Sequence, residues 1–336
     1  MKADTMRLNG IYFGSYWMKS NDVVYLMAQE LEKMCQLQII DPGVYSGNRE
    51  RWFAEDTSRS KRFPVRWINE DKLLSLIESM SVDFIILNSG GLSLRPSSLN
   101  VLKQKGIVCV GISLSDPDVF QFQSNIYSAW YDLFYTNSVH ALRHLYSAAN
   151  IRLLPFAASP DVHRPLPDVP LRYDIVVVGH ARPERIRIMR SLARYFQVGM
   201  FGSGWGSGSR SVHGEEHVRA INSGRLYLSF SSTTAHYMNL KIGLFEAVAC
   251  QRAVVTDYFP EIERYFHYGV EVIGYTSKAM LLDLVAFYIT NQRLRHWIAD
   301  NAYQRLLQEH TWKQRWEGVL DDIQRCRLGQ NLAKRF

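Results

Sequence analysis

The sequence is poor in cysteine: its 336 residues contain four, at positions 35, 109, 250 and 326. No two of them form a CxxC pair, which excludes a zinc knuckle or a CxxC redox motif. No apolar run approaches the roughly 18 residues of a membrane span, and the first ten residues, MKADTMRLNG, lack the apolar centre of a signal peptide. We therefore expect a cytoplasmic protein whose cysteines are reduced and mostly buried.

The sequence also lacks the clustered basic motif of a nucleic-acid-binding protein. Lys and Arg number 39 against 32 Asp and Glu, a formal net charge of +7, but the basic residues are scattered along the chain. A net positive charge without a recognisable binding motif is weak support for nucleic-acid binding, so we expect no nucleic-acid partner. A basic surface attracts anionic donor substrates or anionic lipids equally well, and it makes peripheral membrane contact a second expectation.

A chain of 336 residues is longer than a single hydrophobic core usually supports, so its length predicts two domains. Residues 165–171, PLPDVPL, contain three prolines, which is typical of a semi-rigid linker. We expect a first domain over 1–164, a second over 172–311, and a final helix within 312–336.

The first domain alternates strands and helices, which predicts a doubly wound α/β sheet. Residues 45–66 are polar and aperiodic and predict a long loop or insertion. The expected strands cover 8–13, 38–41, 82–88, 107–112, 131–135 and 151–154, and the expected helices cover 21–34, 70–80, 97–105 and 138–148.

Polar residues and glycines follow several of these strands, at the sheet edge where ligands bind in open α/β folds. The candidates for an acceptor-side site are Gly14, Ser15, Asn88 and Gly90. Asp116, in the run SLSDPD, is a candidate general base, although an Asp-Pro pair is also a frequent turn former.

The second domain opens with an apolar strand over 173–178, followed by Gly179 where a tight strand-to-helix turn is expected. The next helix begins near Pro183 and carries Arg185 and Arg187. A basic side chain beside such a turn can meet a diphosphate, helped by the helix N-terminus. The alternative is a solvated basic face of the helix.

Residues 226–275 contain several of the functional candidates. Their pattern predicts a strand, a loop, a helix, a strand, a short helix and a strand, in that order. Glu246 lies mid-helix among apolar residues with no Lys or Arg three or four positions away, so it needs a partner from elsewhere. Ribose hydroxyls would serve, since a carboxylate accepts two hydrogen bonds from them; a helix Glu that reaches solvent is the alternative. Asp257 follows the next strand, and Glu261 opens the short helix.

Two short sequence patterns in this domain resemble known functional motifs but give little support to either function. The loop GSGWGSG at 202–208 has a serine where a dinucleotide fingerprint needs its third glycine; we expect it, with Gly202 and Trp205, to face the donor. His213, Glu216 and His217 match the HxxEH spacing of zinc peptidases, but a five-residue pattern arises often by chance and Gly214 is a poor helix residue. We expect no metal site and no cofactor.

The sequence resembles glycosyltransferases of the GT-B fold, of the group 1 type and closest to the spore-maturation CgeB-like branch. The resemblance rests on LFEAVACQRAVVTDYFPEIERYFHYGVEVIGYTS with the later EHTWKQRW, and on VVVGHARPERIRIMRSL, FGSGW and LPFAASPDVHRP. These runs cover most of residues 80–320 in the family's order. The resemblance implies two Rossmann-like domains facing a cleft, and a last helix that returns to the first domain.

The resemblance also implies roles for individual residues. Arg185 and Lys241 would meet the diphosphate, Glu246 the ribose, and backbone amides after Asp257 the phosphates, all without a metal. The implied donor-binding set is Gly179, Arg185, Gly202, Trp205, His213, Asn239, Lys241, Glu246, Asp257 and Glu261.

One position departs from the family pattern. Many group 1 transferases have a second glutamate eight residues before the ribose glutamate, and Met238 stands there in this chain. Asn239 is a candidate replacement. The leading expectation is a glycosyltransferase that moves a sugar from a nucleotide-sugar to a glycan, lipid-linked, protein or small-molecule acceptor, with polysaccharide biosynthesis as a setting. The rival is a GT-B protein without catalysis that binds nucleotide-sugars or is structural.

Overall fold

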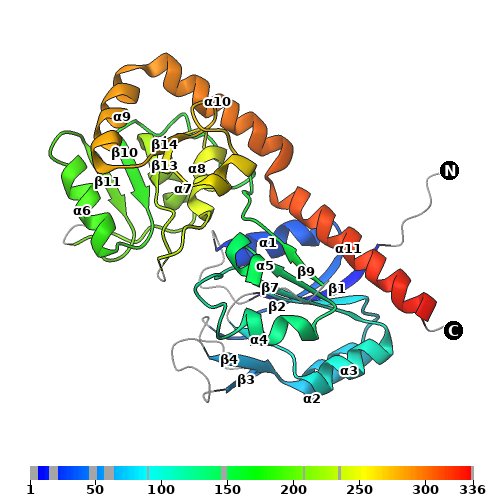
Figure 1. The fold of residues 1–336 in the computed structure, drawn as a ribbon. Helices are drawn as coiled ribbons and strands as arrows, with labels where there is room; N and C mark the ends of the chain where they lie inside the picture. Colours follow the sequence, from blue (N-terminus) through cyan, green and yellow to red (C-terminus); the bar gives the residue numbers. More distant parts are fainter. Residues whose placement is uncertain are drawn as a thin grey trace, which may run out of the picture. The chain divides into compact units, whose positions relative to one another are not determined.

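The structure is a computed structural model that contains two compact units. Unit 1 comprises Met1–Pro155 together with Arg315–Phe336, and unit 2 comprises Phe156–Gln314; Figure 1 shows both. The residues that the structure describes are 7–14, 22–44, 51–56, 64–88, 91–144, 150–206, 209–233 and 236–333.

Unit 1 is built on a parallel six-stranded sheet in the order β2-β1-β5-β7-β8-β9. The order reverses at β1, because β2 lies on one side of it and all later strands lie on the other. This is a doubly wound sheet. Its strands are β1 (Asn9–Gly14), β2 (Gln36–Ile40), β5 (Phe84–Asn88), β7 (Val108–Ser113), β8 (Leu133–Thr136) and β9 (Ile151–Leu153).

The helices of unit 1 begin and end at residues suited to those positions. The Asp22 side chain accepts a hydrogen bond from the amide of Val24 at the start of α1, and Asn69 caps α2 in the same way. Helix α3 starts at Pro96 and stops at Gly106, which adopts a left-handed conformation. The helices are α1 (Val23–Glu32), α2 (Glu70–Glu78), α3 (Pro96–Lys105), α4 (Ser124–Tyr127), the 3₁₀ turn η1 (Ser128–Trp130), α5 (Val139–His144) and α11 (Trp312–Ala333).

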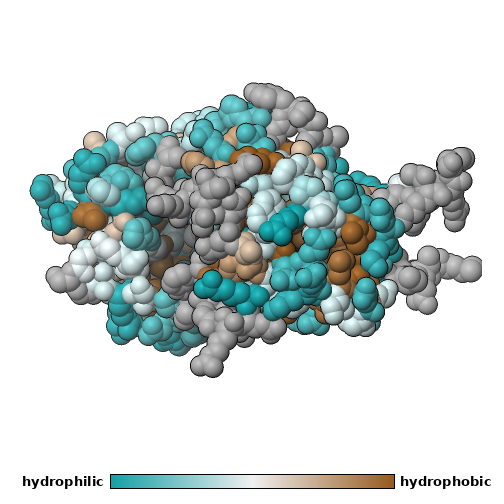
Figure 2. Space-filling view, turned by 90° about the horizontal axis from the view of Figure 1, so that it is seen from below, coloured by the Kyte–Doolittle hydropathy of each residue, from teal (hydrophilic) through white to brown (hydrophobic). Residues whose placement is uncertain are grey.

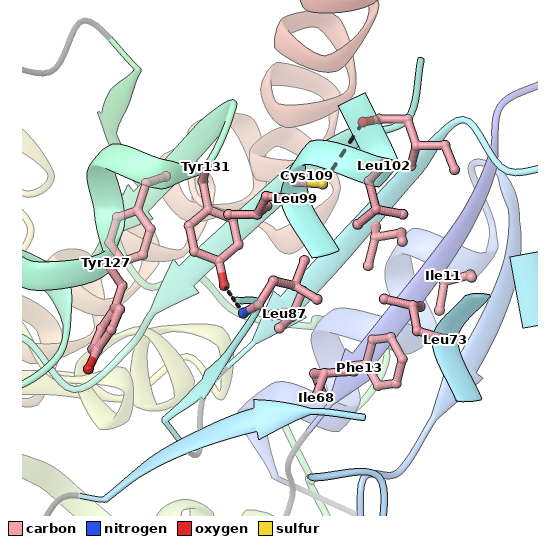
Figure 3. Close-up of a cluster of buried hydrophobic side chains, with 14 of the residues drawn as sticks. Ile11, Phe13, Ile68, Leu73, Leu87, Leu99, Leu102, Cys109, Tyr127 and Tyr131 are labelled. Carbon is pink, nitrogen blue, oxygen red and sulfur yellow. Dashed lines mark hydrogen bonds between the residues drawn. The ribbon is translucent and has the colours of Figure 1, made fainter. Parts of the chain in front are cut away.

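The core of unit 1 lies between the sheet and helices α2 and α3 (Figure 3). Side chains from alternate strand positions, such as Ile11 and Leu87, pack there against Leu73 and Leu99 from the helices. The hydroxyl of Tyr131 enters this core, where it accepts a hydrogen bond from the amide of Leu94 at 3.0 Å. A buried phenol is thus satisfied, as burial of a polar group requires.

The expectation of a loop over 45–66 is wrong in part. Strands β3 (Phe53–Asp56) and β4 (Val65–Ile68) pair antiparallel, and β6 (Leu92–Ser93) joins β4 in a small sheet. The sequence pattern is weak because aromatic and basic side chains share these strands, and the guanidinium of Arg66 lies over the ring of Phe53. Residues 45–50 and 57–63 lie outside the described residues.

Helix α11 belongs to unit 1 from Arg315 onward, although it is the last helix in the sequence. The indole of Trp316 is fully buried, donates a hydrogen bond to the carbonyl of Met27 at 2.8 Å, and packs edge-on against the ring of Tyr12. Further along, Asp322 accepts hydrogen bonds from Tyr135 and Arg152. The helix therefore covers the sheet face opposite to α2 and α3.

Unit 2 is built on a parallel five-stranded sheet in the order β11-β10-β12-β13-β14, with the order reversing at β10. Residues 165–171 belong to this unit and contain no helix or strand. The elements are β10 (Tyr173–Val178), α6 (Pro183–Leu192), β11 (Val198–Phe201), α7 (Glu215–Asn222), β12 (Gly224–Ser229), α8 (Ile242–Ala249), β13 (Ala253–Asp257), η2 (Pro260–Arg264), β14 (Ile273–Tyr275), α9 (Lys278–Thr290) and α10 (Gln292–Glu309).

Helices cover both faces of this sheet. Ile175 and Leu226 pack with Met189 of α6 and Leu281 of α9 on one face. On the other face α8 approaches β12 closely: a Cβ on Gly243 would lie 2.5 Å from the hydroxyl of Tyr227. Glycine is therefore required at this helix–strand contact.

The surface is ordinary for a globular protein. Figure 2 shows mostly hydrophilic side chains on the face drawn, with hydrophobic ones in separate areas. Among the described residues no helix has the length and apolar character needed to cross a bilayer.

The buried indole of Trp316 gives a stability prediction. Trp316→Ala should lower the free energy of unfolding of unit 1 by about 3–5 kcal/mol, because it leaves a cavity between α11 and the sheet. Urea unfolding combined with hydrogen exchange of unit 1 amides measures the change. Trp297→Ala is the control, since that side chain is 47% exposed and its loss should cost far less; equal costs would contradict the packing of α11.

Candidate functional site

The reversal of strand order in unit 2 marks the position of a ligand site. In open parallel sheets, ligands bind beyond the carboxyl ends of the two strands where the order reverses. Here those strands are β10 and β12, which end at Val178 and Ser229. The segments that follow them, 179–182 and 230–233, therefore line the candidate site.

Arg185 links these two segments. Its guanidinium donates hydrogen bonds to the carbonyls of His180 (3.0 Å) and Ser232 (3.3 Å) and lies over the ring of Phe230. Burial and the neighbouring charge of Arg182 lower the pKa of Arg185. The guanidinium nevertheless stays a cation, because the pKa of arginine begins above about 12.

The described residues compensate the charge of Arg185 only in part, because Glu184 and Asp257 lie near enough to oppose the lowering of its pKa by burial. No carboxylate among them forms an ion pair with it, and its Nε is buried without a hydrogen-bond partner. A half-buried cation normally has an anionic partner, because its desolvation costs free energy. A guanidinium in this state, at the start of a helix and at the strand-order reversal, is suited to bind an anion.

A glycine-rich turn shapes one wall of the site. Gly202 has φ +117°, and a Cβ there would lie 2.2 Å from the carbonyl oxygen of Gly179. Trp205 is 8% exposed, and its indole donates a hydrogen bond to the same carbonyl at 2.8 Å. Trp205 thus holds the turn from within the core, and the expectation that it faces a donor stays a prediction.

The end of β13 forms another wall. One carboxylate oxygen of Asp257 accepts a hydrogen bond from the amide of Ser231 (2.7 Å) and the other accepts one from the hydroxyl of Tyr275 (2.9 Å). Asp257 therefore ties the segment after β12 to β13 and β14. Both of its oxygens have partners within the chain.

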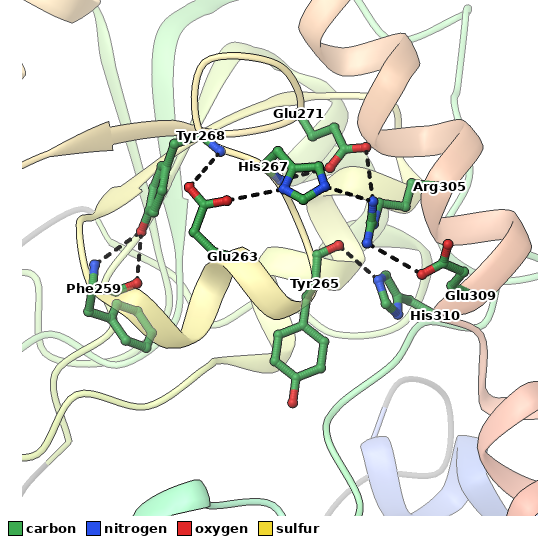
Figure 4. Close-up of polar contacts among 9 residues, drawn as sticks. All are labelled: Phe259, Glu263, Tyr265, His267, Tyr268, Glu271, Arg305, Glu309 and His310. Atoms are coloured by element: carbon green, nitrogen blue, oxygen red, sulfur yellow. Dashed lines mark hydrogen bonds and ion pairs between the residues drawn. The ribbon is translucent and has the colours of Figure 1, made fainter.

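The residues after Asp257 are held by a polar network (Figure 4). The Tyr268 hydroxyl accepts a hydrogen bond from the amide of Phe259 at 3.1 Å and donates to the carbonyl of Asp257 at 3.0 Å. His267 contacts Glu263 at 3.1 Å. The network fixes the short helix η2 and the backbone amides near it.

Glu246 lies at the centre of a buried cluster on α8. Its side chain is 5% exposed; Oε2 is 3.0 Å from Nε2 of His217 on α7, and Oε1 is 3.5 Å from Nε2 of His163. The sequence argument that Glu246 needs a partner from elsewhere is correct, but two histidines supply it.

Electrostatics within this cluster favour an ionised carboxylate. Burial alone would raise the pKa of Glu246, but the charges of His217 and His163 outweigh it and lower that pKa. Burial would lower the pKa of His217, yet the adjacent carboxylate raises it. The pKa of His163 is lowered because burial dominates there. The cluster therefore favours a proton on His217 and an ionised carboxylate on Glu246, and it disfavours a proton on His163.

A separate cavity of about 550 Å³ lies along the outer strand β11. It is lined by residues from β11, α7 and the segment 169–173, including Arg172, Arg210 and Arg219. It also reaches the loop after β11 through Trp205 and Ser209, but none of its lining residues comes from 179–182 or 230–233, the segments at the strand-order reversal.

Part of the chain matches a known protein family. Residues 182–321 match a glycosyl transferase-like family model. A search of curated proteins finds no match.

Many solved structures share the fold. Sucrose-phosphate synthase from Thermosynechococcus elongatus is 12% identical with a TM-score of 0.63, and the match covers 98% of this chain and 100% of that one. Anabaena HepE in complex with UDP-glucose is 11% identical with a TM-score of 0.62, over 98% and 100%. A glycosyltransferase from Rickettsia africae is 10% identical with a TM-score of 0.60, over 95% and 98%.

The fold is GT-B. The two parallel Rossmann-like sheets and these likenesses confirm the fold class expected from the sequence. The matched region, residues 182–321, contains the walls formed by Arg185, Glu246 and Asp257.

The other residues that the sequence predicts to bind the donor lie on several different segments of unit 2. Lys241 stands at the start of α8, Asn239 is buried two residues earlier, and Glu261 lies half-buried in η2. His213 is exposed and precedes α7, which begins at Glu215, so it does not share a helix face with His217. The HxxEH pattern therefore does not form a zinc-peptidase helix.

The acceptor-side candidates lie in unit 1. Gly14 ends β1 and packs so closely that a Cβ would lie 2.7 Å from the ring of Tyr12. Asn88 is fully buried and donates hydrogen bonds to Tyr12 and Met27; it therefore belongs to the core. Ser15 and Gly90 lie outside the described residues.

Asp116 is also buried, at 2% exposure. The hydroxyls of Ser124 (2.8 Å) and Thr136 (2.7 Å) donate to its carboxylate. This carboxylate ties the turn after β7 to α4 and β8. A general base must reach the acceptor hydroxyl, so its catalytic assignment stays a prediction that the observed burial does not favour.

Sequence reasoning missed His163 and His217 as partners of Glu246. His163 stands in the run LPFAASPDVHRP, 83 residues before Glu246. A lone histidine at that distance gives no pairing signal. The HxxEH pattern drew attention to His217, but it paired His217 with His213 and not with Glu246 and His163.

Burial raises the pKa of Asp116 to about 6, although the hydroxyls of Thr136 and Ser124 oppose the rise. The folded state therefore binds this proton more tightly than the unfolded chain, whose Asp pKa is about 3.9. The contribution of Asp116 to stability should be greatest below about pH 4 and be lost as pH rises to about 6.

Asp116→Asn should remove this dependence. Its unfolding free energy relative to the wild type should rise by roughly 2–3 kcal/mol between pH 4 and pH 7, since each pKa unit corresponds to about 1.4 kcal/mol. Urea titrations at both pH values measure it, with Glu78→Gln, an exposed carboxylate of unit 1, as control. A relative stability that stays flat or falls with pH would contradict the prediction.

Proposed function

We propose that the protein is a nucleotide-sugar-dependent glycosyltransferase of the group 1 type, closest to the CgeB-like branch. The proposal is supported above all by Arg185, a cation that forms no ion pair among the described residues and lies at the strand-order reversal of a glycosyl transferase-like region. A diphosphate supplies the missing anion. The acceptor is a glycan, a lipid-linked or protein group, or a small molecule.

The proposed chemistry requires electrostatic stabilisation of a leaving group. When the bond between the anomeric carbon and the diphosphate breaks, negative charge grows on the diphosphate, and fixed donors lower the barrier. Arg185 and Lys241 supply cations, and the start of α8 supplies backbone amides. In this proposal the transfer step uses no metal.

The proposed ribose contact uses Glu246. An ionised carboxylate has about four lone-pair positions, and in this structure His217 occupies one of them at hydrogen-bond distance. The remaining positions can accept the ribose hydroxyls. Both structures of HepE with UDP or UDP-glucose bound make a uridine nucleotide the first ligand to test.

A second candidate is a GT-B protein that binds a nucleotide-sugar without transferring the sugar. It is favoured by Met238, which stands where many relatives of the group 1 type have a glutamate and is 39% exposed. Release of free sugar or formation of a glycoside from a bound nucleotide-sugar would support the transferase; tight binding with neither product would support the second candidate.

Arg185 should control nucleotide affinity. Arg185→Gln should weaken binding of the stabilising nucleotide diphosphate about 10- to 100-fold, because a hydrogen bond to a charged group contributes roughly 1.5–3 kcal/mol. Thermal shift with UDP, GDP, CMP, dTDP and their sugars identifies that nucleotide, and calorimetry measures the affinity. Arg187→Gln, an exposed arginine on the same helix, is the matched control. If no nucleotide binds, or both variants lose affinity equally, the proposed diphosphate site is wrong.

The ribose contact predicts discrimination between a ribonucleotide and its 2′-deoxy form. The wild type should bind the ribonucleotide about 10-fold or more tightly, from one hydrogen bond to a carboxylate. Glu246→Gln should reduce this preference, because a neutral amide accepts more weakly. The four affinities form a double-mutant cycle. An unchanged preference in the variant would show that Glu246 does not contact the ribose.

A further inference from the structure

The buried cluster of His163, His217 and Glu246 has the composition of a metal site. One ligand atom from each residue, Nε2, Nε2 and a carboxylate oxygen, lies within 4.8 Å of the other two. Two imidazoles and one carboxylate are the protein ligands of several catalytic zinc sites. Mg²⁺ and Ca²⁺ prefer oxygen ligands, so this set favours a transition-metal ion.

The ligand atoms lie close to the distances of a tetrahedral site but not at them. With Zn–N and Zn–O bonds of about 2.0–2.2 Å, neighbouring ligand atoms lie about 3.3 Å apart. Here Oε2 of Glu246 lies 3.0 Å from Nε2 of His217, the other oxygen, Oε1, lies 3.5 Å from Nε2 of His163, and one ligand atom of each residue lies within 4.8 Å of the others. Binding of an ion would therefore draw the two imidazoles together and turn the carboxylate toward the ion.

His163 supplies an independent reason to expect a ligand. Its side chain is 1% exposed, and neither ring nitrogen has a hydrogen-bond partner in the part of the chain that the structure describes. A buried polar group without a partner costs about 1–3 kcal/mol. The hydrogen bond between His217 and Glu246 explains those two side chains without a metal, but it does nothing for His163.

The backbone around the cluster is fixed before any ion binds. The amide of His163 donates to the carbonyl of Ser159 at 2.8 Å. The side chain of Asn222 on α7 accepts a hydrogen bond from the amide of Leu166 and donates one to the carbonyl of Arg164, each at 3.0 Å. The three ligands therefore come from three segments that already pack together within unit 2.

We propose that His163, His217 and Glu246 form a binding site for one divalent transition-metal ion of the zinc type. A water molecule completes the coordination, because the chain supplies three ligands and His217 is partly exposed. The ion joins α7, α8 and the segment before β10. Its binding displaces the proton of His217 and competes with ribose for the carboxylate of Glu246.

The first test measures zinc binding to the untagged full-length protein without any nucleotide, so that its outcome is independent of the proposed transferase activity. Competition with a chromogenic chelator should show one tightly bound zinc per chain, and zinc should raise the melting temperature. His163→Gln and His217→Gln should each weaken binding by more than about 100-fold, since even the loss of an outer partner of a metal ligand costs 10- to 100-fold.

Two control variants define the site. His213→Ala removes an exposed histidine just before α7. His140→Ala breaks a pair on α5 between half-buried His140 and exposed His144, whose rings are 4.4 Å apart from centroid to centroid. Both should leave the tight site unchanged. Loss of zinc binding in a control, or its retention in His163→Gln, would overturn the proposal.

A second measurement on the wild type covers the case in which a cluster variant does not fold. Cobalt should give the absorption spectrum of a tetrahedral site, and anomalous scattering at the zinc edge should place the ion beside Glu246. An octahedral cobalt spectrum, or no anomalous peak at the cluster, would overturn the proposal.

Discussion

Parallel pairing of the central strands is the constraint on which the rest of unit 2 depends. Parallel strands need a crossover between them, and the helices α6 and α8 that follow β10 and β12 lie on opposite faces of the sheet. The chain therefore diverges beyond the carboxyl ends of these two strands. Side chains from both segments meet there, and Arg185 reaches carbonyls on each of them.

The same region contains two charges with different compensation. Arg185 has hydrogen bonds to carbonyls but no ion pair among the described residues, whereas Glu246 is buried between two histidines. A cation that is only partly compensated favours a ligand that arrives with negative charge. A compensated carboxylate keeps its ionisation when no ligand is present. Together they suit a ligand with an anionic part and a neutral hydroxyl-bearing part.

The alternation of strands and helices could be predicted from the sequence because apolar periodicity and caps act locally. The strand over 173–178 and the helix from Pro183 are examples, with bounds set by residues that neighbour them in the chain. The short strands β3 and β4, which pair with each other, were not predictable in this way, because aromatic and basic side chains share them and β4 also pairs with β6 beyond the next helix and strand.

The candidate site could be predicted only where it depends on local sequence. Arg185 could be named as a candidate because its position shortly after a strand follows from local sequence. The pairing of Glu246 with His163 depends on a contact between distant segments, which no spacing rule describes. The roles expected of Asn88 and Asp116 stay predictions for a related reason: polar residues after strands can serve the core as well as a ligand, and both of these side chains are buried.

The assignment of α11 to unit 1 has a consequence for synthesis on the ribosome. Unit 2 is one continuous stretch and emerges complete before α11 does, whereas unit 1 is interrupted by it. The surface of Tyr12 and Met27 that Trp316 covers stays open until the final helix has left the exit tunnel. At that stage the nascent chain holds a complete second unit and a first unit that still lacks α11.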